Sequence, residues 1–230
     1  HSMWSDGAAS YYARNNALYR FYENGVSTSI GAFQCGTNRV AFTKVDAEVY
    51  ATCSTAKTAI RNGAAVLWGI SVPTIPPTLA STTGILPAGT YHAAVTYLTA
   101  DGRESGASAL AQIVLASTGG VTTTALPVSG EASVTKKRLY LSNTDGEMLY
   151  MVAEVSAASQ FVTVSTLPSG PELRTAYLVP PPLGVALAHF NGRIFIVDAA
   201  DPTVVWFTEA TDYGHVNIRK NFYKFGADVT

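Results

Sequence analysis

The sequence has few charges. Asp, Glu, Lys and Arg make up 13% of its 230 residues, about half the usual share of a soluble domain. The formal net charge of −1 leaves no overall field that would attract nucleic acid or an anionic membrane, so we expect no nucleic-acid partner. No apolar run approaches the roughly 20 residues that a membrane-spanning helix needs, which argues against a membrane span. The only basic run, Lys136-Lys137-Arg138, lies beside an apolar stretch, and we expect it to be a solvated strand edge.

Cysteine is scarce as well. The two cysteines, Cys35 and Cys53, are too few for a disulfide framework. If the apolar runs on either side of Asp46-Ala47 pair as a hairpin, Cys53 falls opposite Val40 and not opposite Cys35. We therefore predict two free, buried thiols, which suits a protein made in a reducing cytoplasm.

Motifs of catalysis and metal binding are also missing. The sequence contains no H-E-x-x-H, no paired C-x-x-C and no glycine-rich phosphate loop. Its densest acidic cluster consists of Asp198, Asp201, Glu209 and Asp212. The spacing of this cluster does not match the alternating ligands of an EF-hand loop, and a turn at Asp201 explains part of it; a surface calcium ion is the alternative. We expect no catalytic residue, no cofactor and no metal site, and therefore not an enzyme.

What the sequence does have is alternation. Apolar residues recur with a period of two along most of the chain, and turn residues interrupt them about every eight to twelve positions. This pattern predicts an all-β fold. The helical signal is weak: residues 57–67 leave room for one helical turn, which Asn62-Gly63 would interrupt.

The centre of the chain, residues 76–176, has the pattern of one β-sandwich. Prolines at 76–77 and 180–182 border it, because two adjacent prolines do not fit inside a sheet. Strands are expected near Leu79 and over 91–98, 109–116, 121–125, 138–142, 148–155 and 161–164. About seven short strands in about 100 residues predict an immunoglobulin-like or fibronectin type III-like sandwich.

The stretch "DGRES" at 101–105 follows the second of these strands, in which Tyr91, Val95 and Tyr97 are expected on one face. Gly102 accepts a positive φ, so a turn between strands explains the stretch. Its arginine and glutamate would stay in water, and its serine does not fit the G-x-S-x-G nucleophile motif. We therefore expect ordinary surface positions here and no catalytic site.

The two flanks resemble each other. The segment "NRVAFTKVDAEVYATC" (38–53) can be laid over "GRIFIVDAADPTVVWFTE" (192–209): each has a polar turn, an arginine, an apolar strand, an acidic turn and a second strand with an aromatic residue. Repeated hairpins with polar turns are typical of propeller blades. After an apparent tag remnant at 1–3, we expect residues 4–75 and 177–230 to form one β domain, into which the sandwich is inserted.

Three stretches carry a resemblance to a family. They are "LPAGTYHAAVTYLTADGRESGAS" (86–108), "KKRLYLSNTDGEMLYMVAEV" (136–155) and "VPPPLGVALAHFNGRIFIVDAADPTVVWFTE" (179–209). Together they resemble tail-associated structural proteins of tailed bacteriophages and prophages, in which a fibronectin type III-like sandwich interrupts propeller-like β repeats.

The resemblance implies a virion protein without enzymatic activity. Such a protein would be made in the bacterial host cytoplasm and would assemble with other virion proteins and with copies of itself. A whole propeller needs at least about four blades of roughly forty residues. The flanks are shorter than that, so they would be a fragment, a reduced blade set or a sheet completed by other subunits.

Aromatic residues crowd both ends of the chain. They are Trp4, Tyr11, Tyr12, Tyr19, Phe21 and Tyr22 at one end and Trp206, Phe207, Tyr213, Phe222, Tyr223 and Phe225 at the other. Core packing between the flanks is the simplest interpretation, and an exposed surface for sugar stacking or subunit contacts is the alternative. Two further hypotheses for function follow: an adsorption module that binds a host surface glycan or receptor, and the accessory β region of a secreted bacterial enzyme.

Overall fold

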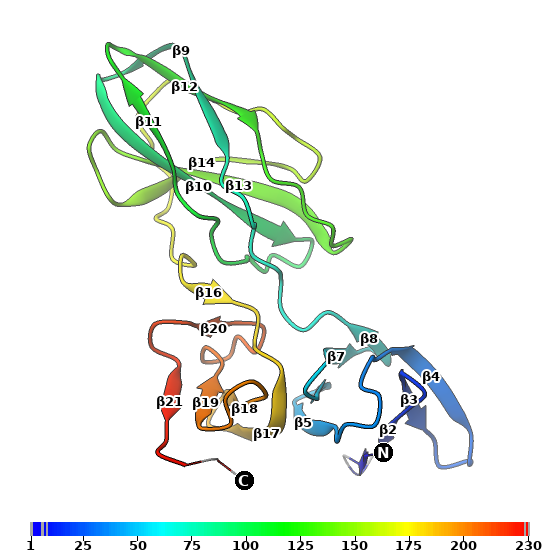
Figure 1. Ribbon diagram of the computed structural model, residues 1–230. Coiled ribbons are helices and arrows are strands. Elements are labelled where there is room, and N and C mark those ends of the chain that lie inside the picture. Colours follow the sequence, from blue (N-terminus) through cyan, green and yellow to red (C-terminus); the bar gives the residue numbers. More distant parts are fainter. Residues whose placement is uncertain (1, 6, 8, 228, 230) are drawn as a thin grey trace. The chain divides into compact units, whose positions relative to one another are not determined.

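The computed structural model of the chain describes residues 2–5, 7, 9–227 and 229. Every regular secondary-structure element in this part of the chain is a β-strand, so the predicted all-β fold is confirmed. The described part of the chain contains no helix that is long and apolar enough to cross a membrane. The chain divides into two compact units, residues 1–69 with 180–230 and residues 70–179 (Figure 1).

The unit of residues 70–179 is a β-sandwich. One antiparallel sheet has the strand order β11-β10-β13-β14, and the other has the order β15-β12-β9. The strands are β9 (Thr78–Leu86), β10 (Gly89–Thr99), β11 (Ala111–Leu115), β12 (Gly119–Ala125), β13 (Val134–Ser142), β14 (Leu149–Ser156) and β15 (Thr163–Val164), and β16 (Leu178–Val179) follows them. Each strand expected from the alternation is therefore present.

Alternate residues of β10 fill the core between the two sheets. Tyr91 and Val95 are fully buried there, and Val121 reaches them from the opposite sheet. Tyr97 continues the same row into a small separate cluster with Ile70. The predicted face of β10 is thus confirmed, and the period of two that placed it comes from the pleat of the strand.

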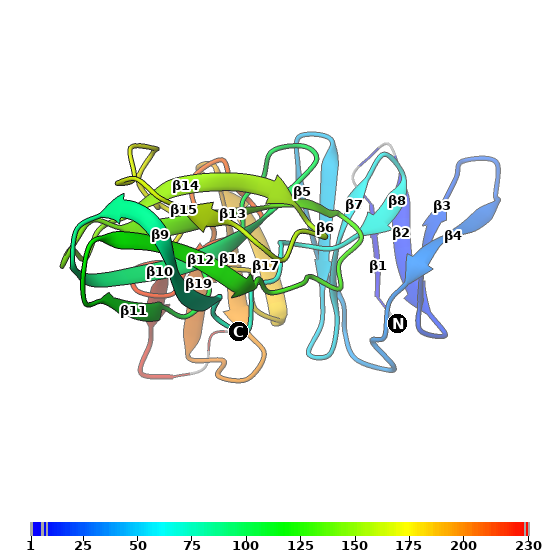
Figure 2. The same cartoon turned by 90° about the horizontal axis from the view of Figure 1, so that it is seen from above.

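The other unit contains three four-stranded antiparallel sheets among the described residues. We call them the N-sheet (β1–β4), the middle sheet (β5–β8) and the C-sheet (β17-β18-β19-β21); Figure 2 shows them side by side in this order. The bounds are β1 (Met3–Ser5), β2 (Ser10–Arg14), β3 (Ala17–Phe21), β4 (Ser27–Ala32), β5 (Ala41–Val45), β6 (Glu48–Thr52), β7 (Lys57–Arg61), β8 (Ala64–Val66), β17 (Gly184–Phe190), β18 (Arg193–Asp198), β19 (Val204–Phe207), β20 (Val216–Asn217) and β21 (Phe222–Lys224).

Two-residue turns that contain asparagine join consecutive strands in two of these sheets. Asn62 and Gly63 both have positive φ, 50° and 77°, as a two-residue type I′ hairpin turn requires. The helical turn considered for 57–67 is therefore wrong: the asparagine-glycine pair does not interrupt a helix but joins β7 to β8. Asn15 and Asn16, with φ of 51° and 58°, join β2 to β3 in the same way.

The middle sheet is buried on both faces. Val49 and Ala51 of β6 pack in a cluster with Tyr11 of the N-sheet. Tyr50, between them in sequence, points the other way and packs in a cluster with Ile196 of the C-sheet. Because neighbouring residues of a strand face opposite sides, one strand supplies both cores. The two ends of the chain are thereby joined into one unit.

The prediction of free thiols is wrong. The hairpin register is as predicted, with Ala41 opposite Thr52, so Cys53 does follow on opposite Val40. However, Cys35 lies in the segment between the N-sheet and β5, and its Cα is 6.2 Å from that of Cys53, to which it is disulfide-bonded. The register of a hairpin determines only which residues of its two strands lie opposite each other. The segment that carries Cys35 is not part of this hairpin and approaches Cys53 from outside it.

The basic run is not a strand edge either. It lies in β13, which pairs with β10 on one side and with β14 on the other. Lys137 is fully buried, and its Nζ donates a hydrogen bond of 2.9 Å to the carbonyl oxygen of Ser159. Burial lowers the pKa of this ammonium group. Lysine can occupy a central strand here because its long stem reaches a carbonyl acceptor.

The disulfide gives a prediction for stability. Replacing Cys35 and Cys53 together by Ala should lower the free energy of unfolding by about 3 kcal/mol, because the bridge closes a loop with a sequence separation of 18 residues in the unfolded chain. Urea denaturation of the variant and of the wild type, each with and without reductant, measures this. Reductant should affect only the wild type; equal stability of all four samples would contradict the bridge.

Candidate functional site

The stretch after β10 forms the predicted turn. Gly102 has a φ of 83°, and its N–H donates to the carbonyl oxygen of Thr99 over 3.0 Å. Asp101 is exposed, and its carboxylate accepts hydrogen bonds from the Thr99 hydroxyl and, over 2.8 Å, from Arg103 Nε. The aspartate thus holds the turn closed, and Gly102 supplies the left-handed conformation that the turn needs.

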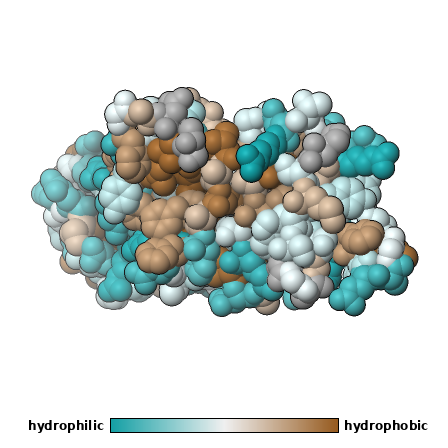
Figure 3. All heavy atoms as spheres, turned by 90° about the horizontal axis from the view of Figure 1, so that it is seen from below, coloured by the Kyte–Doolittle hydropathy of each residue, from teal (hydrophilic) through white to brown (hydrophobic). Residues whose placement is uncertain are grey.

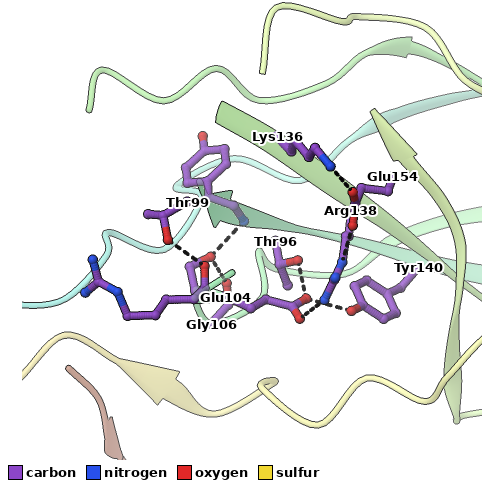
Figure 4. A network of polar contacts seen from close by, with 11 residues as sticks. Thr96, Thr99, Glu104, Gly106, Lys136, Arg138, Tyr140 and Glu154 are labelled. Atoms are coloured by element: carbon purple, nitrogen blue, oxygen red, sulfur yellow. Dashed lines mark hydrogen bonds and ion pairs between the residues drawn. The ribbon is translucent and has the colours of Figure 1, made fainter. Parts of the chain in front are cut away.

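Glu104 and Ser105, which follow the turn, are not surface positions, contrary to the prediction. The Glu104 side chain is only 14% exposed. Its carboxylate accepts three hydrogen bonds of 2.6 Å each, from Thr96 Oγ1, Arg138 Nη1 and Tyr140 Oη (Figure 4). A carboxylate can leave water when convergent donors replace its hydration. These donors come from β10 and β13, which the local sequence of the turn does not reveal.

Ser105 is fully buried next to this network. Its hydroxyl accepts a hydrogen bond from the N–H of Tyr97 over 2.9 Å and donates one to the carbonyl oxygen of Gly106 over 2.8 Å. A serine whose proton is donated to a backbone carbonyl has no general base to activate it. The serine hydroxyl therefore serves as the hydrogen-bond acceptor that a carbonyl of a neighbouring strand would otherwise supply to the backbone of β10.

The network as a whole connects strands. Arg138 bridges Glu104 to Glu154 of β14, and Lys136 pairs with the same Glu154 over 2.6 Å. Burial, and after it the hydrogen bond to Glu104, raises the pKa of Tyr140, so its hydroxyl stays a donor. With all members paired, the network offers no group for acid, base or nucleophilic chemistry and serves to fix three strands of one sheet.

The acidic cluster does not converge on a metal site. Asp198 Oδ2 accepts a hydrogen bond of 2.7 Å from Trp206 Nε1, and Asp201 binds the backbone of its own turn. Asp212 instead lies 2.8 Å from Nδ1 of His215. Within the described part of the chain, no group of three His, Cys, Asp or Glu residues could hold a metal ion. Glu209 pairs with Lys220 over 3.3 Å. The carboxylates thus bind donors of nearby turns and side chains.

A groove of about 710 Å³ lies on the three-sheet unit. It lies where the first strands of the three sheets come together and is lined by residues 2–4, 37, 39–42 and 185–187. The rings of Trp4 and Phe42 are stacked in its wall, 5.9 Å apart and inclined by 11°. Arg39 is exposed beside them. Sequence reasoning missed this groove because three distant segments build it.

The terminal aromatic residues divide between core and surface. Tyr11 and Trp206 pack against the two cores of the unit, as the simpler interpretation expected. Tyr12 and Tyr19 stack on the opposite face of the N-sheet, and Tyr223 is 57% exposed on the C-sheet. Seen from below, apolar residues gather over the half of the molecule that contains β17–β19 (Figure 3). Part of the set is therefore core, and part lies on the surface.

No protein-family model matches the chain, and no curated protein sequence matches it.

The hydrogen-bond network around Glu104 should contribute to the stability of the sandwich. Replacing Glu104 by Ala should lower the free energy of unfolding by about 3 kcal/mol, because hydrogen bonds to a charged group are lost and buried donors remain unpaired. Glu104→Gln, which keeps the shape of the side chain, should cost less. Urea denaturation monitored by circular dichroism measures both values.

Glu147 is the matched control, because it is an exposed glutamate in the turn between β13 and β14 of the same sandwich. Glu147→Ala should change the free energy of unfolding by less than about 0.5 kcal/mol. If Glu104→Ala and Glu147→Ala had equal effects, the buried network would not contribute to stability.

Proposed function

We propose that the chain is a structural component of a phage or prophage virion, associated with the tail, and that it acts through assembly and subunit contacts. The observation that carries this proposal is a pair of aromatic faces on the three-sheet unit, on which no other described sheet of this unit packs. One bears the stacked rings of Tyr12 and Tyr19, and the other bears the rings of Phe207 and Tyr223, 5.2 Å apart. Exposed patches of this kind are typical of protein–protein contacts.

The satisfied polar groups support the same proposal. Glu104, Lys137 and Ser105 lie near the turn that resembles the tail family, and all three side chains are paired within the sandwich. Polar networks of this kind stiffen a fold and leave nothing free for chemistry. The sandwich would then be the fibronectin type III-like module that the resemblance implies.

The disulfide is compatible with a particle that acts outside the cell. Disulfides persist in oxidising surroundings, including virion surfaces. A chain made in the host cytoplasm would form the Cys35–Cys53 bond after its release. A secreted protein would meet the same conditions, so the bond supports an extracellular working place and does not choose between these two classes.

The groove favours a second candidate function, a carbohydrate- or receptor-binding adsorption module. An aromatic ring in a concave wall stacks well on the apolar face of a sugar, and Trp4 occupies that position with Arg39 nearby. Under this hypothesis the ligand is a neutral or acidic glycan of the host surface.

The test of the virion proposal is the composition of particles. Phage particles from the bacterial strain that carries the gene, purified by density gradient, should contain peptides of this chain at a fixed ratio to the major tail protein in quantitative mass spectrometry. Absence of the chain from intact, infectious particles would overturn the proposal. If the purified chain bound glycans, with loss of binding in Trp4→Ala but not in Phe161→Ala, the adsorption module would be favoured; Phe161 is a control because it is exposed in the sandwich.

A further inference from the structure

The C-sheet has an aromatic outer face. In β18, Ile194 and Ile196 point into the core that is shared with the middle sheet, so Phe195 between them points outward. The ring of Phe195 lies 5.8 Å from that of Phe207, and Phe207 lies 5.2 Å from Tyr223. Three strands thus contribute a continuous row of rings to a face that no other described sheet covers.

Phe190 extends this row. The strand register places it opposite Arg193, on the outward side of the C-sheet, and 71% of it is exposed. The guanidinium carbon of Arg193 lies 5.2 Å from the ring centre of Phe207 on the same side. An exposed face this rich in aromatic residues is unusual for a monomer.

The N-sheet has an equivalent outer face. Tyr11 and Ala13 of β2 are buried in the core against the middle sheet, so Tyr12 points outward. Its ring stacks on that of Tyr19, 5.0 Å away and inclined by 8°. Met3 lies directly opposite Tyr12 in the register and is 66% exposed. Phe21 follows Tyr19 by two residues in β3, so it lies on the same face, and it is 37% exposed.

The middle sheet shows what covers such faces in this fold. It has the same four-stranded order as its neighbours, but both of its faces are packed against another sheet. Corresponding strands lie next to each other across these contacts, with β17 against β5 and β4 against β8. In this chain, the faces of the middle sheet are therefore covered by four-stranded sheets of the same kind and orientation. We expect the same kind of sheet to cover the outer faces of the N-sheet and the C-sheet.

The three sheets are arranged around a common inner edge. Residues of β1, of β5 with the segment before it, and of β17 all line the groove, so the first strand of each sheet faces this edge. Sheets that radiate from their first strands form propellers, which close with about four to eight blades. Two copies of a three-sheet unit would give six sheets, whereas three copies would give nine.

We propose that two copies of this chain close a six-sheet ring, in which the outer face of each C-sheet packs on the outer face of the partner's N-sheet. The two junctions are equal by twofold symmetry, and each joins different surfaces. The groove then becomes part of a channel that both copies line. This inference deepens the proposed assembly function by naming the contact.

Size-exclusion chromatography with light scattering tests the ring. The wild-type chain should have twice the chain mass of 24.3 kDa. The C-face variant Phe190→Glu/Tyr223→Glu should have half the wild-type mass, and so should the N-face variant Met3→Glu/Phe21→Glu, because each introduces charges into both junctions. The control Ile85→Glu/Phe161→Glu alters equally exposed residues of the sandwich and should keep the wild-type mass. Circular dichroism confirms that each variant is folded.

Mixing separates this arrangement from other dimers. A one-to-one mixture of the C-face and N-face variants retains one intact junction, so it should regain the mass of two chains. A wild-type monomer at the highest soluble concentration, an open-ended polymer, or a mixture that stays monomeric would overturn the ring. Because presence in particles is measured separately, a monomer found in virions refutes only the ring, and a dimer absent from virions refutes only the virion role.

Discussion

The two-sided burial of the middle sheet is the constraint on which the three-sheet unit depends. Its strands supply apolar residues to both neighbours, with Val49 and Ala51 on one side and Tyr50 and Ala59 on the other. The C-sheet follows the sandwich in sequence, more than a hundred residues after β8, yet it completes the second core. Long-range packing of this kind costs loop-closure entropy, which grows only slowly with loop length.

The sandwich is held by a different combination of forces. Its core of Tyr91, Val95 and Leu139 is apolar, but one flank of the sheet carries a network of paired charges. Glu104 and Lys137 are withdrawn from water and hydrogen-bonded, Glu104 to donors on β10 and β13 and Lys137 to the carbonyl oxygen of Ser159 in the connection after β14. Such a network specifies a register, since a slip of one residue would leave every member unpaired.

Much of the fold could be predicted from the sequence, because the period of two and the turn residues are local signals. The hairpin at Asp46, the seven central strands and the row from Tyr91 to Tyr97 all follow from them. The errors have a common physical origin. The Cys35–Cys53 bond, the donors around Glu104 and the acceptor for Lys137 come from segments that are not strand neighbours in the local pattern, and the groove is built by three separate segments. No periodicity encodes these contacts.

Hydrogen exchange tests the central claim, that the middle sheet joins the two ends of the chain into one cooperative unit. Ile196 of the C-sheet is fully buried, and Ile196→Ala leaves a cavity in the core that it shares with the middle sheet. If the unit is cooperative, the amides of β6 and of β18 should exchange faster by the same factor in this variant. Acceleration in β18 alone, with β6 unchanged, would contradict the account.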